Sequence, residues 1–215
     1  MSIEPGVVLL MQWLSPAYPV GAFAYSHGLE AACNAGQITN AETLADWLGD
    51  LLLYGSGRSD PIILAAAYQA QDDAALVQVD ARTRAFSPSR ERLAEAVSQG
   101  AAFCQITSGL WGDDLPDLTY PVAVGRAARL HGLSLDLTLQ MYVHAFVSNL
   151  VAAAQRLAPV GQLEGQRVLT DLAPLIRDAA QNALDSDLST LAGVSFASDI
   201  ASMHHETQYS RIFRS

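Results

Sequence analysis

Hydrophobic residues along the chain recur at steps of three and four, which is the spacing of one face of a helix. Segment 41–55 shows the pattern most clearly, because one stripe carries Leu44, Trp47, Leu48, Leu51 and Leu52. Before the stripe, Thr39 and Glu42 have the spacing of a capping box, and Gly55 suits the end of a helix. The pattern predicts an amphipathic helix here with one face buried.

Proline, glycine and serine divide the rest of the chain into further helical segments. The sequence "GDDLPDLTYP" is the clearest loop, and residues 185–194 are predicted to form another. The predicted helices are one opened by Asp60-Pro61, one over 73–85, one from Ser87-Pro88 to Trp111, one over 121–131, one capped by Ser134, one after Gly161 that Pro174 kinks or splits, and one near Ser195.

Residues 137–155 contain no charged side chain and are apolar on nearly every side. The segment has roughly the length of a membrane span. It also carries five polar residues that lipid would penalise, namely Gln140, His144, Ser148, Asn149 and Gln155. We therefore expect the central helix of a helical bundle, with His144 as a buried core histidine, and no membrane segment.

No stretch alternates between apolar and polar residues as a half-buried strand does, and no linker separates a second domain. The fold prediction is an all-α, single-domain helical bundle of about ten helices over residues 1–215.

Half of the residues are hydrophobic and only 16% are charged, against about 25% in a typical globular protein. This apolar surplus favours a permanent protein partner or self-association. The net charge is −10, and all twelve basic residues are arginine. An acidic chain without a basic cluster is a poor nucleic-acid binder. The lack of lysine excludes a Walker A loop and Schiff-base chemistry.

Cys33 and Cys104 are far apart and form no CxxC motif, so we expect free thiols in a reducing compartment. Residues 7–24 resemble a short signal peptide, but the leading segment carries Glu4 and no basic residue, and Pro16 and Pro19 interrupt it. We expect a cytoplasmic protein.

Candidate catalytic chemistry is sparse. No nucleophile signature such as GxSxG occurs, and "GSG" at 55–57 has the character of a helix terminator. We therefore expect no catalytic residue and no cofactor. The one histidine cluster, His204-His205, has side chains about 100° apart on a regular helix. We favour an exposed or partner-facing pair and keep a metal site at these residues as an alternative.

Two segments have the composition of recognition surfaces. Residues 15–30, "SPAYPVGAFAYSHGLE", are stiffened by prolines and carry three aromatic side chains, which form either a core plug or a contact surface. Residues 204–215, which we call the tail, hold the aromatic and arginine residues that dominate binding hot spots. We interpret the tail as a segment that is loose alone and orders on a partner.

These segments also carry a resemblance. "LSPAYPVGAFAYSHGLE", "NLVAAAQRLAPVGQLEGQRVLTDLAPLI" and "IASMHHETQYSRIFRS" resemble, in this order, three motifs of the urease accessory protein F family. Residues 58–120 match only in helical character, and Leu163 stands where the family pattern has threonine. These departures leave the middle region without assigned partner contacts.

The resemblance implies a dimeric, non-enzymatic maturation factor for urease, a nickel enzyme. It implies binding to the accessory protein called D or H and to the nickel-carrying GTPase G, with docking on the urease apoprotein to assist nickel insertion. Carried over residue by residue, it implies a partner-binding set of Phe23, Tyr25, His27, Glu30, His205, Glu206, Gln208, Tyr209, Arg211, Phe213 and Arg214. Two alternatives stay open: direct nickel binding through His204 and His205, and modulation of GTP hydrolysis by the partner GTPase.

Overall fold

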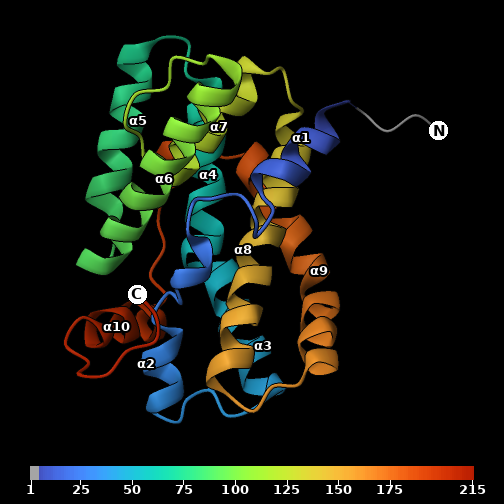
Figure 1. Cartoon of the computed structure of the whole chain (residues 1–215), viewed down its shortest axis with the longest axis vertical. Helices are drawn as coiled ribbons and strands as arrows, with labels where there is room; N and C mark the ends of the chain where they lie inside the picture. Colours follow the sequence, from blue (N-terminus) through green and yellow to red (C-terminus); the bar gives the residue numbers. More distant parts are fainter. Residues whose placement is uncertain (1–4) are drawn as a thin grey trace.

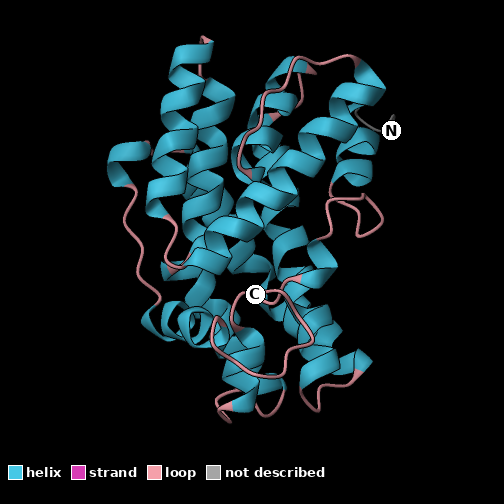
Figure 2. Ribbon diagram, turned by 60° about the vertical axis from the view of Figure 1, so that its left-hand side comes forward, coloured by secondary structure: helices cyan, strands magenta, loops and turns pink. Residues whose placement is uncertain are grey.

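The computed structural model describes residues 5–215, and every regular element in that range is helical (Figures 1 and 2). This confirms the predicted all-α class and the number of helices. The elements are α1 (Pro5–Trp13), η1 (Ala22–Ala24), α2 (Leu29–Asn34), α3 (Ala41–Tyr54), α4 (Ser56–Gln69), α5 (Asp73–Phe86), α6 (Arg90–Trp111), α7 (Tyr120–Leu130), α8 (Leu135–Leu157), α9 (Gln162–Leu184), η2 (Leu188–Thr190) and α10 (Phe196–His205), where η1 and η2 are single 3₁₀ turns.

One continuous hydrophobic core joins the helices into a single bundle. Helix α4 lies at its centre and packs against α3, α5, α7, α8 and α9. Helices α4 and α7 approach closely where a Cβ at Gly125 would lie 2.3 Å from the carbonyl oxygen of Leu64. The missing side chain therefore lets the two backbones touch.

Helix α8 is also central, since it packs against α9, α4 and α2. By length and composition it is the one helix in the described range that could cross a membrane, and half of its apolar window is buried inside the bundle. Its predicted place within the bundle is confirmed. The expectation of a core histidine in this helix was wrong, because His144 falls on the side of α8 that faces solvent.

Two helices begin differently from the sequence prediction. Helix α3 is capped by Asn40 and Thr43 instead of Thr39 and Glu42: Asn40 Oδ1 accepts the N–H of Thr43, and Thr43 Oγ1 accepts the N–H of Asn40. This reciprocal pair uses the side chains nearest the first turn. Helix α4 begins at Ser56, so that Pro61 lies inside it. The proline removes only one backbone hydrogen-bond donor.

Other boundaries follow the predictions with small changes. Helix α6 starts after the cap residue Ser89, two residues beyond the predicted serine, and Ser134 caps α8 as predicted. Pro174 was predicted to kink or split its helix, and it does not split it, because α9 runs unbroken through the proline. A continuous helix survives there since its apolar face, including Leu172 and Ile176, is buried against neighbours that hold it in place.

We predict that Gly125→Ala destabilises the protein by about 2 kcal/mol, because the new methyl group would push α4 and α7 apart. Gly109→Ala is the matched control: it also lies within a helix, but its Cβ would meet nothing within 4 Å. Better helix propensity should make this control neutral or stabilising by up to about 1 kcal/mol. Urea unfolding of both variants checks the result, and equal effects would contradict close α4–α7 packing.

Candidate partner-binding surface

The end of the chain folds back onto residues near its beginning. In Figure 1, α10 and the C-terminus lie beside η1 and α2 at one end of the molecule. The backbone N–H of Arg214 donates to the carbonyl oxygen of Ala24 at 2.8 Å, and the N–H of Ser26 donates to that of Ser215 at 2.8 Å. The tail, which we expected to be loose alone, is therefore seated on its own chain.

Glu30 is the anchor of this arrangement. It lies in the first turn of α2 and is only 3% exposed. Its carboxylate accepts the backbone N–H of Ile212 at 2.8 Å and that of Phe213 at 2.9 Å. A buried carboxylate is tolerated only when donors compensate its lost hydration. The tail supplies those donors from its backbone.

His205 joins the same carboxylate from α10. Its side chain is fully buried, with Nε2 3.3 Å from Glu30 Oε2 and Nδ1 2.7 Å from Glu91 Oε2. Only a protonated imidazole donates from both nitrogens, so this geometry suits the cationic ring. Glu91 Oε1 also accepts a hydrogen bond from Arg211 Nη1 at 2.6 Å. One histidine and one arginine thus tie α10 and the tail to the start of α6.

A second buried cluster lies next to the first. Glu95 contacts Arg92, lies 3.1 Å from His27 Nδ1, and accepts the hydroxyl of Ser215 at 2.7 Å. Burial alone would raise the pKa of Glu95, but Arg92, His27 and the hydrogen bonds from His27 and Ser215 lower it to about 2. Burial and the charge of Arg92 lower the pKa of His27. Glu95 is therefore a firmly ionised acceptor.

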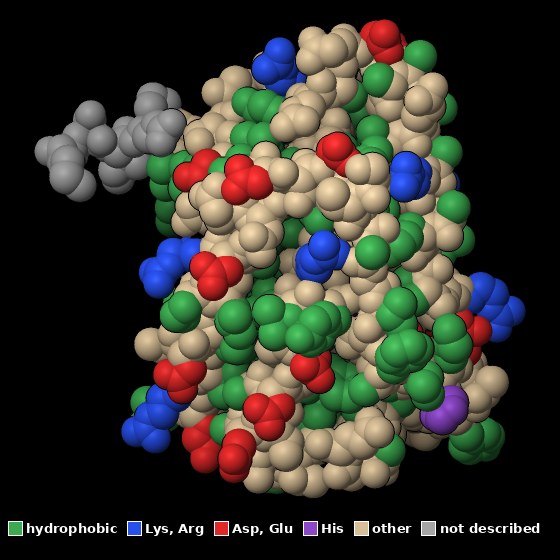
Figure 3. Space-filling model, turned by 180° about the vertical axis from the view of Figure 1, so that it is seen from behind, with side chains coloured by type: hydrophobic (Ala, Val, Ile, Leu, Met, Phe, Trp, Pro, Cys, Tyr) green, Lys and Arg blue, Asp and Glu red, His purple; other side chains and the backbone are tan. Residues whose placement is uncertain are grey.

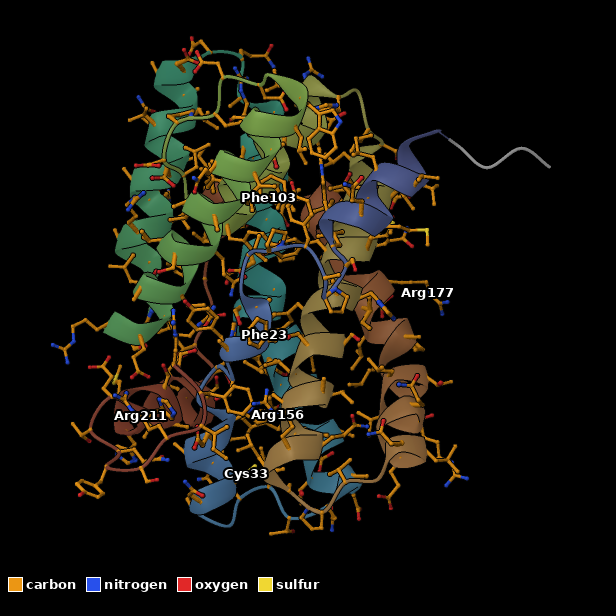
Figure 4. The ribbon with its side chains drawn as sticks, viewed as in Figure 1. Phe23, Cys33, Phe103, Arg156, Arg177 and Arg211 are labelled. Atoms are coloured by element: carbon orange, nitrogen blue, oxygen red, sulfur yellow. The ribbon has the colours of Figure 1, made fainter. Side chains whose placement is uncertain are left out.

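The aromatic ring of Phe213 fixes the tail from the other side. The ring is 4% exposed, and the guanidinium carbon of Arg156 lies 4.4 Å from its centroid. Arg156 also donates to the carbonyl oxygen of Phe23 at 3.2 Å. In Figure 4, Arg156 and Phe23 lie near each other, and Arg211 lies apart from both, beside α10. A cation–π contact of this kind orients both side chains.

The structure divides the predicted partner-binding residues into two groups. Five are buried within the chain: Tyr25, His27, Glu30, His205 and Phe213. The remaining six are exposed or half-buried: Phe23, Glu206, Gln208, Tyr209, Arg211 and Arg214. Direct partner contact stays a prediction, and in this conformation only the second group is available for it.

Sequence reasoning missed the acceptors and donors that receive the tail, namely Glu91, Arg92, Glu95 and Arg156. It also missed an apolar stripe on α10, where Phe196, Ile200 and Met203 are all exposed. Their spacing places them on one helical face, so the pattern was present in the sequence. From behind, Figure 3 shows hydrophobic side chains gathered at the end of the molecule where α10 lies.

The candidate metal ligands do not converge. His204 is exposed, whereas both ring nitrogens of the buried His205 face carboxylates. Within residues 5–215, no group of three histidine, cysteine or acidic side chains is arranged to hold a metal ion.

Comparison with known proteins identifies the family to which the chain is similar. The family model described as UreF matches residues 38–173. A protein of Ruegeria sp. (strain TM1040) is 59% identical, covering 96% of both chains, and one of Roseobacter denitrificans is 55% identical, covering 95% of this chain and 92% of its own. A third, from Ruegeria pomeroyi, is 51% identical, covering 98% and 97%. All three bear the name urease accessory protein UreF.

We predict that Glu30→Gln releases the tail, because the neutral amide is a weaker acceptor and presents an N–H₂ group to the donors of Ile212, Phe213 or His205. Trypsin should then cleave after Arg211 at least tenfold faster, as followed by mass spectrometry of the released peptide. Glu42→Gln, an exposed change on α3, is the control. Equal cleavage rates in all three proteins would contradict the anchoring role of Glu30.

A second prediction concerns acid stability. The folded-state pKa of Glu95 is about 2 against an ordinary value of 4.5, so its stabilising contribution is complete above pH 4.5 and is lost as the pH falls towards 2. This contribution is roughly 3 kcal/mol. Urea unfolding between pH 6 and pH 3 should show a steeper loss for the wild type than for Glu95→Gln.

Two other titrating groups, His27 and Asp60, are coupled to Glu95 and bear on that comparison. His27, with a lowered pKa, also loses its contribution as the pH falls below 6.5. Asp60 acts in the opposite sense, because burial raises its pKa from 3.8 to about 6. Both groups are present in the wild type and the variant, but Glu95 raises the pKa of each, so Glu95→Gln lowers both pKa values and makes the variant more sensitive to acid at these two groups. This acts against the effect of Glu95 itself, so a steeper loss of stability in the wild type still identifies Glu95. Parallel stability curves for the two proteins would refute the assignment to Glu95.

Proposed function

Because the chain belongs to the UreF family of urease accessory proteins, we propose that it serves urease maturation as a non-enzymatic scaffold. In this proposal the protein bridges the D/H accessory protein and the nickel-carrying GTPase G, and the assembly assists nickel insertion into the urease apoprotein. Nickel is the cargo of the assembly. We further propose that the protein is a cytoplasmic homodimer.

The observation that carries the scaffold proposal is the exposed surface formed by α10 and the tail. Phe196 is 73% exposed, Ile212 is 63% exposed and the side chain of Tyr209 is entirely in solvent. Large apolar side chains of this kind dominate protein–protein binding energies once a partner removes them from water. We propose that this surface contacts the D/H protein and contributes to the site that receives the GTPase.

The buried residues have a separate role in the proposal. Glu30, His205 and Glu95 set the path of the tail, and the tail path sets where Tyr209 and Arg211 project. A surface held in its binding conformation loses less conformational entropy on association than a loose one. The family signature at residues 15–30 would then act through the tail.

The chemistry of the chain supports a non-enzymatic role. All twelve basic residues are arginine, so a lysine-containing phosphate loop for GTP must come from another subunit. Direct nickel binding by His204 and His205 has no support from the geometry, since one side chain is exposed and the other is engaged by Glu30 and Glu91. We therefore favour the scaffold over direct nickel binding.

We predict that Tyr209→Ala weakens binding to the D/H protein by about 1–3 kcal/mol, as expected for an aromatic hot-spot residue. The side chain is fully exposed, so its removal should leave the free energy of unfolding unchanged. Tyr54→Ala is the matched control, since Tyr54 is also an exposed tyrosine but lies at the end of α3. Calorimetric titration with the purified D/H protein measures both affinities.

The control separates surface-specific binding from a general loss of aromatic area. If Tyr209→Ala and Tyr54→Ala bind the D/H protein as tightly as the wild type does, the proposed contact surface is wrong. If both variants bind equally weakly, the contact is not specific to the tail.

A further inference from the structure

The first turn of α6 is capped from two places in the chain. The first N–H groups of a helix have no acceptor within that helix. Ser89, the residue before α6, supplies one acceptor, since its Oγ receives the N–H of Arg92 at 3.1 Å. The N–H groups of Arg90 and Glu91 donate instead to Glu206 Oε1, at 2.8 and 3.4 Å. A residue 116 positions beyond Arg90 therefore completes the cap of α6.

The side chain of Arg90 binds the other oxygen of the same carboxylate. Its Nε and Nη2 atoms both donate to Glu206 Oε2, at 3.2 and 3.0 Å, and such charge-assisted hydrogen bonds are stronger than neutral ones. Burial raises the pKa of Glu206, but the hydrogen bonds from Arg90 and Glu91 outweigh burial and lower it. The positive end of the α6 dipole also favours a negative charge at this place. Glu206 is therefore an ionised group with a fixed position.

These contacts use the hydrogen-bonding capacity of Glu206. An ionised carboxylate has about four acceptor sites. Its four donors here are two backbone N–H groups and two guanidinium N–H groups, shared equally between the two oxygens. The side chain of Glu206 is 16% exposed, whereas that of Arg90 is 84% exposed. The family resemblance implies a partner contact for Glu206, but a partner gains a hydrogen bond from it only by displacing one that is already made.

Glu206 lies where the tail leaves α10. The residue before it, His205, is the last residue of α10 and binds Glu91. Two consecutive residues thus bind the first two residues of α6, which fixes both the position and the rotation of the chain at this junction. Tyr209 follows three positions after Glu206, and its side chain is entirely exposed. The direction in which Tyr209 projects therefore depends on the junction.

We propose that Glu206 is a positioning residue for the contact surface of α10 and the tail. It caps α6 from the end of α10, directs the tail, and makes no contact with the partner protein. A surface whose residues are already placed loses less conformational entropy on binding. The part of this inference that concerns partner binding rests on the proposed function, whereas the capping of α6 does not.

Release of the tail tests the capping role without a partner. Glu206→Gln should speed tryptic cleavage after Arg211 about fivefold, because the amide has one acceptor atom and turns its N–H₂ group towards donors. Glu164→Gln is the matched control, since Glu164 caps another helix, α9, by accepting the N–H of Gly161. The melting temperatures of the two variants should agree within about 2 °C, since exposed ion pairs contribute little to stability. Faster cleavage then reports local opening of the tail.

Amide hydrogen exchange locates the change within α6. In Glu206→Gln, the N–H groups of Arg90 and Glu91 should exchange faster than in the wild type. The N–H of Arg92 should exchange at the wild-type rate, because Ser89 Oγ still accepts it. Cleavage and exchange rates equal to those of the wild type would overturn the capping role.

Calorimetric titration with the purified D/H protein separates positioning from direct contact. We expect Glu206→Gln to weaken binding about fivefold and to show faster tail cleavage as well. Weaker binding with a wild-type cleavage rate would mean that Glu206 contacts the partner, which overturns the proposal. Unchanged binding with faster cleavage would overturn it too, because the direction of the tail would then not affect recognition. A wild-type protein that does not bind the D/H protein would contradict the proposed function, and the cleavage assay would still decide the capping role.

Discussion

Burial of the Glu30 carboxylate is the constraint on which the functional end of this protein depends. A carboxylate removed from water requires donors within hydrogen-bond reach. Here two come from the backbone of the tail, at Ile212 and Phe213, and one comes from His205. Docking of the tail and burial of Glu30 are therefore one event. Neither is favourable without the other.

The same logic extends outward from Glu30. His205 leads to Glu91 and Arg211, and Ser215 leads to Glu95, Arg92 and His27. The network connects residues almost two hundred positions apart in sequence. Most of the network is buried, and hydrogen bonds are stronger where the local dielectric constant is low. Loss of one member would leave its partners buried without a hydrogen bond. Residues on the outer surface, such as Tyr209, are not part of this network.

The buried network, which we call the inner layer, and the exposed residues around it, which we call the outer layer, explain how the motifs of the family relate to each other. The N-terminal segment supplies Ser26 and Glu30, and the C-terminal segment supplies the groups that bind to them. We expect changes in the inner layer to alter the shape of the contact surface, and changes in the outer layer to alter contacts alone. In our proposal both layers serve one purpose, which is to present α10 and the tail to other accessory proteins.

The sequence by itself determined the helical class, most helix positions and the segments that matter, because helical periodicity and capping act over a few residues. Asp72 at the cap of α5 and Ser134 at the cap of α8 are local signals of that kind. Only the tertiary structure decided which side chains face outward. His144 looked buried because its helix is apolar, and His205 looked exposed because its segment is polar. The partners of His205, which are Glu30 and Glu91, lie on other helices, and the neighbours of α8 decide which of its sides is buried. Burial at both positions therefore depends on packing over long distances in the chain.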